Sequence, residues 1–306
     1  MTTTLRHPLL EPTQGMRRSL SSASREAHAG TNVISTSLDE EAIAAFAPDA
    51  KIAMLATLDE DGLPHLTLLT SLDAHGPREL TFGQFSEGLS KDHLRRDPRA
   101  AFLVMTMDRR LWRGKARWTR EAKTGEQHEA YNRRPMFRYN AYFGIHTVHY
   151  LDLLEIEGPT RPDTTAILGG VVANVLLWRS VADRSGERIL STWAERHLAS
   201  PSTLKFLAYV GDDGFPAIVP LVPCRSAGSR RLVLAGRIHD EGLANIAAGS
   251  HCTVHGLNLA MESVMVRGRL STWTQTLGIP HATMDIDLVY NSMPPNHGVV
   301  YPAAAR

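Results

Sequence analysis

The feature that most restricts the fold of this chain is an internal repeat with a spacing of about 152 residues. Residues 55–64 read LATLDEDGLP and residues 207–216 read LAYVGDDGFP. Both segments begin as an apolar strand and end in an Asp-Gly turn, where glycine accepts the positive φ of a tight hairpin. Two further matches follow in the same order: Glu87-Gly88-Leu89 with Glu241-Gly242-Leu243, and Trp112-Arg113-Gly114-Lys115 with Val266-Arg267-Gly268-Arg269. The unit is too long for a solenoid repeat, so the chain contains two copies of one domain.

The first copy is a series of short, closely spaced strands with few helices. We expect an opening helix capped by Ser37, with Glu40 completing a capping box, and a counterpart of this helix over Glu187–Leu198 in the second copy. The remaining expected elements are strands Ile52–Leu58, His65–Leu72 and Glu79–Gln84, a helix Ser86–Arg96, strands Arg99–Met107 and Leu111–Thr119, a polar helical insertion Arg120–Phe143 interrupted at Pro135, and a strand Ile145–Ile156. This spacing favours a small antiparallel barrel over a parallel α/β sheet.

Composition excludes several classes of protein. The chain has 33 Lys and Arg against 32 Asp and Glu, so it lacks the basic surface that sequence-independent nucleic-acid binding requires. Its two cysteines, Cys224 and Cys252, indicate a reducing compartment, and we expect a cytoplasmic protein. The longest nearly uncharged apolar run, Ala166–Trp178, is shorter than the roughly 20 residues that cross a bilayer, so no membrane span is expected. Arg17-Arg18 is followed by small polar residues, which is not the pattern of an export signal.

The junction between strand Glu79–Gln84 and the following helix is a candidate anion site. A helix N-terminus offers unpaired N–H groups and a partial positive charge, both suited to a phosphate. Ser86 and Ser90 add hydroxyl groups there, and Lys91 adds a full charge. An ordinary capped surface helix with a solvated lysine is the alternative interpretation.

The second copy favours the anion site, because it is apolar or acidic where the first copy is polar. Ser90 and Lys91 correspond to Ala244 and Asn245, and Asp240 and Glu241 bring negative charge to the same junction. On the facing strand, Thr67, Thr70 and Ser71 correspond to Val219, Val222 and Pro223. We therefore expect the first copy to bind an anionic ligand and the second to serve as a scaffold.

The residues so far described resemble a known family. The order Asp61-Gly62-x-Pro64-His65, Thr81-x-Gly83, Ser90-Lys91 and Leu94-Arg95-Arg96-Asp97-Pro98-Arg99 is similar to that of the FMN-binding split barrels of the pyridoxamine 5′-phosphate oxidase-like superfamily, chiefly its small FMN-binding proteins. The match is better in the first copy, over residues 38–157. Many members carry a basic residue four positions before the leucine of the Leu-x-x-Asp-Pro element, whereas this chain has Ser90 there and its lysine one place later.

The resemblance implies FMN as the cofactor and assigns its contacts. One strand would lie along the isoalloxazine ring, through Thr67, Leu68, Leu69, Thr70 and Ser71. The next strand and the helix start would hold the ring edge and the phosphate, through Thr81, Phe82, Gly83, Gln84, Ser90 and Lys91. Members of the family usually bind FMN at a dimer interface, so we expect a homodimer or an internal pseudo-dimer.

The expected fold is mainly β with α: two tandem split β-barrel domains of antiparallel strands, joined by a helical linker. We expect a mobile N-terminal arm over residues 1–34, an FMN-binding barrel over 35–162, a linker over 163–185 and a degenerate second barrel over 186–306.

The expected function is that of an FMN-dependent oxidoreductase acting on an unidentified small molecule or redox partner. The flavin would carry the electron chemistry, so no protein acid or base needs to stand out, and no catalytic residue is assigned. The alternatives are a haem-binding or haem-degrading protein with His239 or a residue of the Tyr131–His149 group as axial ligand, a non-enzymatic flavin electron carrier, and a protein that binds a deazaflavin. Adjacent ligand-type residues such as His251 and Cys252 point to opposite faces of a strand, so no metal site is predicted.

Overall fold

The computed structural model describes residues 34–85, 88–135, 144–236, 240–292 and 297–302. The predicted N-terminal arm therefore lies outside the described residues, except for Ile34. Strands dominate the described part and form two sheets in which every pairing is antiparallel. The predicted class, two tandem split β-barrels joined by a helical linker, is confirmed.

The elements of the first barrel are, in chain order, β1 (Ile34–Ser35), α2 (Glu40–Phe46), β2 (Lys51–Leu58), β3 (Pro64–Leu68), β4 (Asp73–Ala74), β5 (Glu79–Gln84), α3 (Leu89–Arg96), β6 (Arg99–Thr106), β7 (Leu111–Ala122), α4 (Glu126–Arg133) and β8 (Thr147–Thr160). Its sheet has the strand order β3-β2-β6-β7-β8-β5-β4, with β1 added beside β8. The core beneath it is apolar and includes Phe46, Phe102 and Trp112, whose rings meet edge to face.

The elements that follow are α6 (Thr164–Val181), α7 (Thr192–Ala199), β9 (Leu204–Val210), β10 (Pro216–Val219), β11 (Cys224–Ser226), β12 (Arg231–Ala235), α8 (Glu241–Asn245), β13 (His251–Leu257), β14 (Ser263–Leu270), β15 (Thr274–Thr276), β16 (Ile279–Asn291) and β17 (Gly298–Tyr301). The second sheet has the order β10-β9-β13-β14-β16-β12-β11, with β15 and β17 both added beside β16. This is the same path of strands as in the first sheet, as the sequence repeat predicts.

Several predicted boundaries were wrong, for local reasons. The first helix is capped by Asp39, whose carboxylate accepts from the Ala42 N–H at 2.8 Å, so Ser37 is not the cap. Its counterpart α7 begins at Thr192 after the cap Ser191, five residues later than predicted. Strand β3 ends at Leu68, because a turn closed by the Leu72 N–H to the Leu69 carbonyl follows it.

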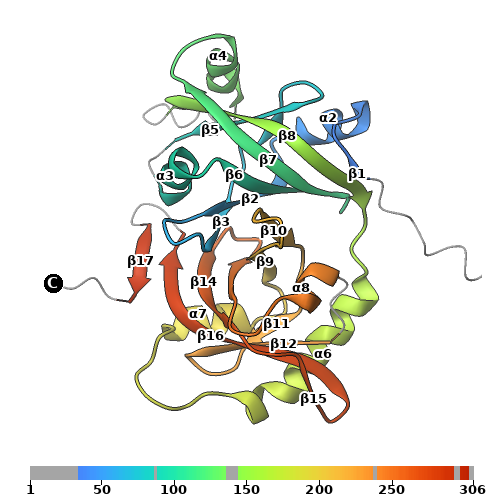
Figure 1. Ribbon diagram of the computed structural model, residues 1–306, viewed down its shortest axis with the longest axis vertical. Helices are drawn as coiled ribbons and strands as arrows, with labels where there is room; N and C mark the ends of the chain where they lie inside the picture. The colour runs from blue at the N-terminus through green and yellow to red at the C-terminus, as the bar shows by residue number, and fades with distance from the viewer. Residues whose placement is uncertain (1–33, 86–87, 136–143, 237–239, 293–296, 303–306) are drawn as a thin grey trace, which may run out of the picture. The chain divides into compact units, whose positions relative to one another are not determined.

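The polar insertion also differs from its prediction. Its first residues, Arg120–Ala122, extend strand β7, and the helix α4 covers only Glu126–Arg133. Residues 136–143 of the predicted stretch lie outside the described part of the chain. Figure 1 shows α2 and α4 at the outer end of the first barrel, away from the second barrel.

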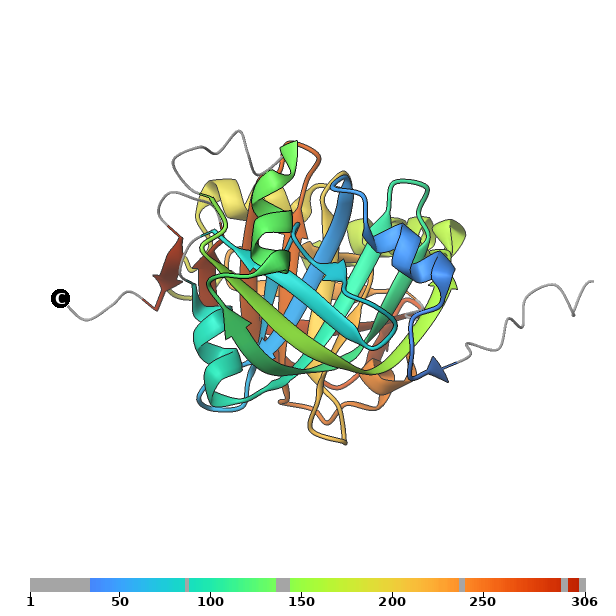
Figure 2. The same ribbon diagram turned by 90° about the horizontal axis from the view of Figure 1, so that it is seen from above.

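An apolar layer joins the two barrels. It is contributed by β2, β3, β6 and β7 of the first barrel and by β9 and β10 of the second, and its buried members are Met54, Ala56, Leu66, Ala101, Leu103, Met105, Leu111, Phe206, Ala208 and Ile218. Figure 1 shows β2, β3, β9 and β10 side by side at the junction, and Figure 2 shows the strands of the two sheets overlapping when seen from above. Both barrels therefore share one continuous interior at this point.

Helix α6 forms the helical linker and packs on the second sheet. Its buried face contains Gly170, Ala173, Asn174 and Leu177, and the Asn174 amide donates to the carbonyls of Gly170 and Pro223 at 2.8 and 2.9 Å. By length and composition alone this helix would suffice to cross a membrane, and only 22% of its apolar window is buried within the protein. It is longer than the run Ala166–Trp178 because Thr164 and Thr165 precede that run in the helix, and Arg179, Ser180 and Val181 follow it.

Shortening Phe206 to alanine should destabilise both barrels together, because its fully buried ring belongs to the shared apolar layer. We expect Phe206→Ala to lower the free energy of unfolding by about 3–5 kcal/mol, measured by urea denaturation. Leu259→Ala, at a side chain that is 90% exposed, is the control and should change it by less than about 0.5 kcal/mol. A Phe206→Ala protein as stable as the Leu259→Ala protein would show that the barrels do not depend on this layer.

Candidate functional site

A cavity of about 520 Å³ lies between the two barrels, at one side of the apolar layer. We call it the interface cavity. Its walls in the first barrel are strand β3, the turn after it, β5 and the start of α3; its walls in the second are β14, β16 and the loops beside them. The lining residues are His65, Leu66, Thr67, Leu68, Leu69, Thr70, Ser71, Gly83, Phe85, Gly88, Leu89, Ser90, Lys91, Ala260, Met261, Ser263, Tyr290, Ser292 and His297.

Strand β3 presents its backbone to this cavity. It is an edge strand, and the Leu69 N–H donates to Ala53 while the Asp59 N–H donates to Leu63, so odd-numbered residues bond to β2. In an antiparallel ladder the alternate residues then turn their N–H and C=O groups outward. Two outward carbonyls, those of Pro64 and Leu66, meet Thr253 Oγ1 and His255 Nδ1 of the second barrel at 2.5 and 3.3 Å. The N–H groups of Leu66 and Leu68 lie on this same outward edge of β3, and both residues line the interface cavity.

Helix α3 points its N-terminus at the cavity and carries the predicted polar pair there. Ser90 is 3% exposed, and the helix begins after Gly88 with no side-chain cap. A Cβ built on Gly88 would lie 3.4 Å from Lys91 Nζ, which places that ammonium over the first turn of the helix. Helix dipole, hydroxyl and ammonium thus act at one place, where a phosphate would be held. Ser86, the other predicted hydroxyl donor, lies outside the described residues.

The lining carries no Asp or Glu among the residues that the structure describes. Its charged and titratable groups are Lys91, His65, His297 and Tyr290. A cation at a helix N-terminus in the wall of a low-dielectric cavity favours an anionic ligand. The volume lies within the roughly 300–1,000 Å³ that small-molecule sites occupy.

Ser71 ties the turn after β3 to strand β5. Its hydroxyl donates to the Gly83 carbonyl at 2.7 Å and accepts from the Gly83 N–H at 3.1 Å. Gly83 is needed because a Cβ there would come within 2.5 Å of the Ile145 side chain. These bonds fix the two strands that line the cavity relative to each other, so Ser71 shapes the wall of the cavity.

Three of the predicted contact residues lie behind the cavity wall rather than in it. The Thr81 hydroxyl bonds to Tyr131 and Gln127 at 3.0 and 3.2 Å, and Phe82 belongs to the barrel core. Gln84 Oε1 bonds to His149 Nε2 at 2.6 Å, and that ring also stacks on Phe82. The other eight predicted residues, Thr67, Leu68, Leu69, Thr70, Ser71, Gly83, Ser90 and Lys91, all line the cavity.

Behind β5, a buried polar network fastens the insertion of the first copy to the cavity wall. The Tyr131 hydroxyl of α4 donates to the Ser71 carbonyl at 2.9 Å. Next to it, Asp73 pairs with Lys51 at 3.1 Å and with Arg134 at 2.6 Å. Burial lowers the pKa of Lys51 and raises the pKa of Asp73, and the pairing opposes both shifts. Two cations on one carboxylate compensate for its removal from water.

The sequence analysis did not assign the residues that close the cavity from the second barrel. Tyr290 meets His65 edge to face at 5.3 Å between ring centroids, and His65 meets His93 in the same way at 5.1 Å. Met261 adds an apolar side chain at a positive φ of 62°. Of the sequence predictions, only the internal pseudo-dimer implied such a wall, because neither Tyr290 nor Met261 stands in a motif.

Burial keeps three histidine rings near the cavity neutral. It lowers the pKa of His65 to about 3, and the charges of His93, His255, Arg267 and Lys91 act in the same direction. Burial likewise lowers the pKa of His149 to about 3 and that of His255 to about 4. These three rings are therefore neutral near pH 7.

Among the described residues, no group of three or more His, Cys, Asp or Glu side chains could hold a metal ion. His251, considered with Cys252 in the sequence, pairs with Asp287 at 2.8 Å. Both cysteines are buried and unpaired.

The segment that forms most of the first barrel matches a known protein family. The model for the family described as pyridoxamine 5′-phosphate oxidase matches residues 39–167, which contain all of the predicted contact residues. This segment, less than half of the 306 residues, is similar to the pyridoxamine 5′-phosphate oxidase family. No curated protein sequence matches the chain.

Three solved structures that are similar to this chain each cover less than half of it. A protein described as a putative pyridoxamine 5′-phosphate oxidase from Lactobacillus delbrueckii is 19% identical over 40% of this chain and 94% of its own, with a TM-score of 0.32. An FMN-binding protein from Syntrophomonas wolfei is 13% identical over 46% and 95%, with a TM-score of 0.32. HupZ from Group A Streptococcus is 13% identical over 40% and 96%, with a TM-score of 0.33.

The neutral histidines give the protein a defined acid sensitivity. The folded pKa of His65 lies below the usual 6.5, so the unfolded chain binds more protons between these values, and stability is lost as the pH falls from about 6.5 toward 3. We expect His65→Gln to reduce the slope of unfolding free energy against pH by up to about 1.4 kcal/mol per pH unit between pH 6 and 4. Urea titrations at several pH values measure it, with His75→Gln, at an exposed position, as the control. Equal slopes in the wild type and His65→Gln would contradict a neutral buried His65.

Proposed function

We propose that this chain is a flavoprotein that holds FMN in the interface cavity and acts as an oxidoreductase on a small molecule. The observation that carries the proposal is the position of Ser90 and Lys91, which line the cavity together at the N-terminus of helix α3. A flavin bound there would accept or donate hydride or single electrons.

The residues present fit such a ligand in three respects. Lys91, Ser90 and the first turn of α3 match a phosphate. The outward N–H groups of Leu66 and Leu68 match carbonyl and nitrogen acceptors along a ring edge. Leu68, Leu69 and Met261 give apolar surface for a planar ring system. Because both barrels supply walls, one chain would hold the ligand as an internal pseudo-dimer without needing a second chain.

Two of the residues considered as haem ligands do not reach the cavity. Tyr131 and His149, from the group considered as axial ligands, are engaged in the buried network behind the cavity and do not line it. His239, the other candidate, lies outside the described residues. A deazaflavin would present the same phosphate to Lys91, so the ligand has to be identified chemically.

Replacing the polar pair at α3 tests the binding site. We expect Ser90→Ala with Lys91→Ala to weaken FMN binding at least tenfold, because a charge-assisted hydrogen bond contributes about 1.5–3 kcal/mol. Equilibrium dialysis of FMN against the full chain measures the effect. Asn245→Ala, at the equivalent position of the second copy, is the matched control and should bind FMN as tightly as the wild type. Equal affinities for all three proteins would remove the assignment of the site.

The absorption spectrum of the freshly purified protein tests the function itself. A two-band flavin spectrum, with FMN identified by mass after heat release, is the expected result. A Soret band would indicate haem, and a released deazaflavin would change the cofactor but not the site. Reversible reduction without turnover of any donor and acceptor pair would make the protein an electron carrier.

A further inference from the structure

A pocket of about 200 Å³, which we call the second pocket, also lies between the two barrels. Its walls are β7 and β8 of the first barrel and β9, β10 and the start of α8 of the second. Strand β10 supplies the wall that β3 supplies in the interface cavity, through Pro216, Ala217 and Ile218. These residues correspond in the repeat to Pro64, His65 and Leu66. Ala217 and Ile218 thus stand where His65 and Leu66 stand in the interface cavity, and Asp240 stands where the repeat has Ser86, so these parts of the two pockets can be compared directly.

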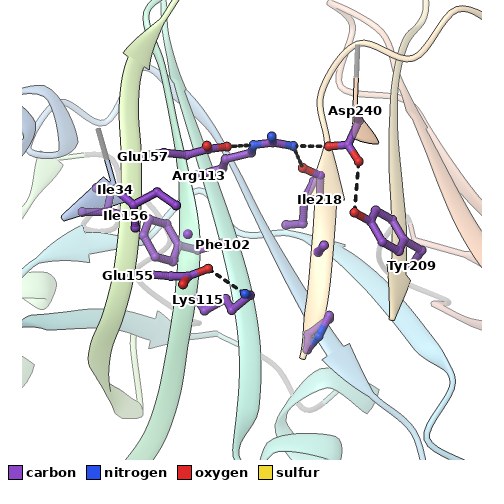
Figure 3. A pocket seen from close by; sticks show the side chains of 13 residues that line it. Ile34, Phe102, Arg113, Lys115, Glu155, Ile156, Glu157, Tyr209, Ile218 and Asp240 are labelled. Atoms are coloured by element: carbon purple, nitrogen blue, oxygen red, sulfur yellow. Dashed lines mark hydrogen bonds and ion pairs between the residues drawn. The ribbon is translucent and has the colours of Figure 1, made fainter. Parts of the chain in front are cut away.

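In the second pocket an arginine crosses from one barrel to the other. Figure 3 shows Arg113 of β7 between Glu157 of its own barrel and Asp240 of the second. The Arg113–Asp240 contact is 2.7 Å, and the same guanidinium donates to the Ile218 carbonyl at 3.1 Å. Arg113 therefore lies across the edge of β10, where a ligand would meet the equivalent backbone.

Asp240 is held in place for this contact. Its side chain is 6% exposed, and its other oxygen accepts from the Tyr209 hydroxyl at 3.0 Å and from the Leu243 N–H at 2.9 Å, which caps α8. The carboxylate thus stands at the start of the helix that corresponds to α3, where a phosphate would have to bind. A fixed anion there already satisfies the helix N-terminus.

The equivalent arginine in the other half of the repeat has a different partner. Arg267 pairs with Asp59, at the turn after β2, at 2.5 Å, and lies 3.6 Å from Asp287. It is absent from the lining of the interface cavity. Asp59 corresponds to Gly211, and Asp240 corresponds to Ser86. Each arginine thus pairs with a carboxylate of the opposite barrel that has no counterpart in the arginine's own barrel.

The remaining charges of the second pocket are also paired. Lys115 contacts Glu155 and Asp213, each at 2.7 Å. Both cations of the described lining, Arg113 and Lys115, are therefore paired with carboxylates. Breaking the Arg113–Asp240 pair would leave the buried carboxylate of Asp240 without its cation, so this contact resists displacement by a ligand.

We propose that the Arg113–Asp240 ion pair closes the second pocket to flavin, so that one chain binds one FMN, in the interface cavity alone. This inference rests on the proposed function. It makes Asp240 the residue that keeps the second pocket closed.

Two variants distinguish the effect of the Arg113–Asp240 ion pair from the effect of lacking a serine and a lysine at α8. Both carry Ser90→Ala and Lys91→Ala, which weaken the first site, and both carry Ala244→Ser and Asn245→Lys, which transfer its polar pair to α8. The second variant also carries Asp240→Ser, the residue that the repeat has at position 86. Isothermal titration with FMN, after melting curves have shown that both variants are folded, should detect binding at least tenfold tighter when Asp240 is replaced.

Similar FMN affinities in the two variants would overturn the proposal. Titration of the wild type is a second test that needs no grafted site: one FMN per chain is expected, and two FMN per chain would overturn the inference while leaving the proposed function intact. No binding by the wild type would overturn the proposed function, and the inference with it.

Discussion

The apolar layer between the barrels is the constraint on which the rest of the structure depends. Strands β3 and β10 are edge strands of their sheets, and an exposed edge with apolar side chains is prone to pair with other chains. Here each edge is covered by the other barrel, through side-chain bonds such as Thr253 to Pro64 and Arg113 to Ile218. The interface that protects these edges also creates the two pockets, so folding and ligand binding are properties of the same surface.

Within this interface, small differences in charge give the pockets different chemistry. The interface cavity has a cation at a helix start and the neutral ring of His65; the second pocket has three carboxylates that share two cations, Arg113 and Lys115. The backbone of the two barrels follows the same strand order, so it does not account for the contrast. A few side chains at equivalent positions do: Lys91 against Asn245, and Asp59 against Gly211.

Much of this organisation could be predicted from the sequence. The Asp-Gly turns fixed the hairpins of both copies, strand β5 has the predicted bounds Glu79–Gln84, and the comparison of Lys91 with Asn245 selected the polar side. The sequence did not show which side chains of β5 face the cavity. Thr81 and Gln84 were predicted to contact the ligand, but they bond to Tyr131 and His149 behind the cavity wall. The roles of Tyr290 and Met261 depend on how the two copies meet, which no local pattern encodes.

The covalent link between the two barrels through α6 has a consequence for how such a protein can change. In a symmetric dimer of identical chains every substitution appears twice, so both sites at the interface gain or lose a residue together. A fused pair is free of that restriction. A carboxylate can enter one pocket at Asp240 without entering the other, and the region around the closed pocket is then free to evolve for stability alone while the open one retains its chemistry.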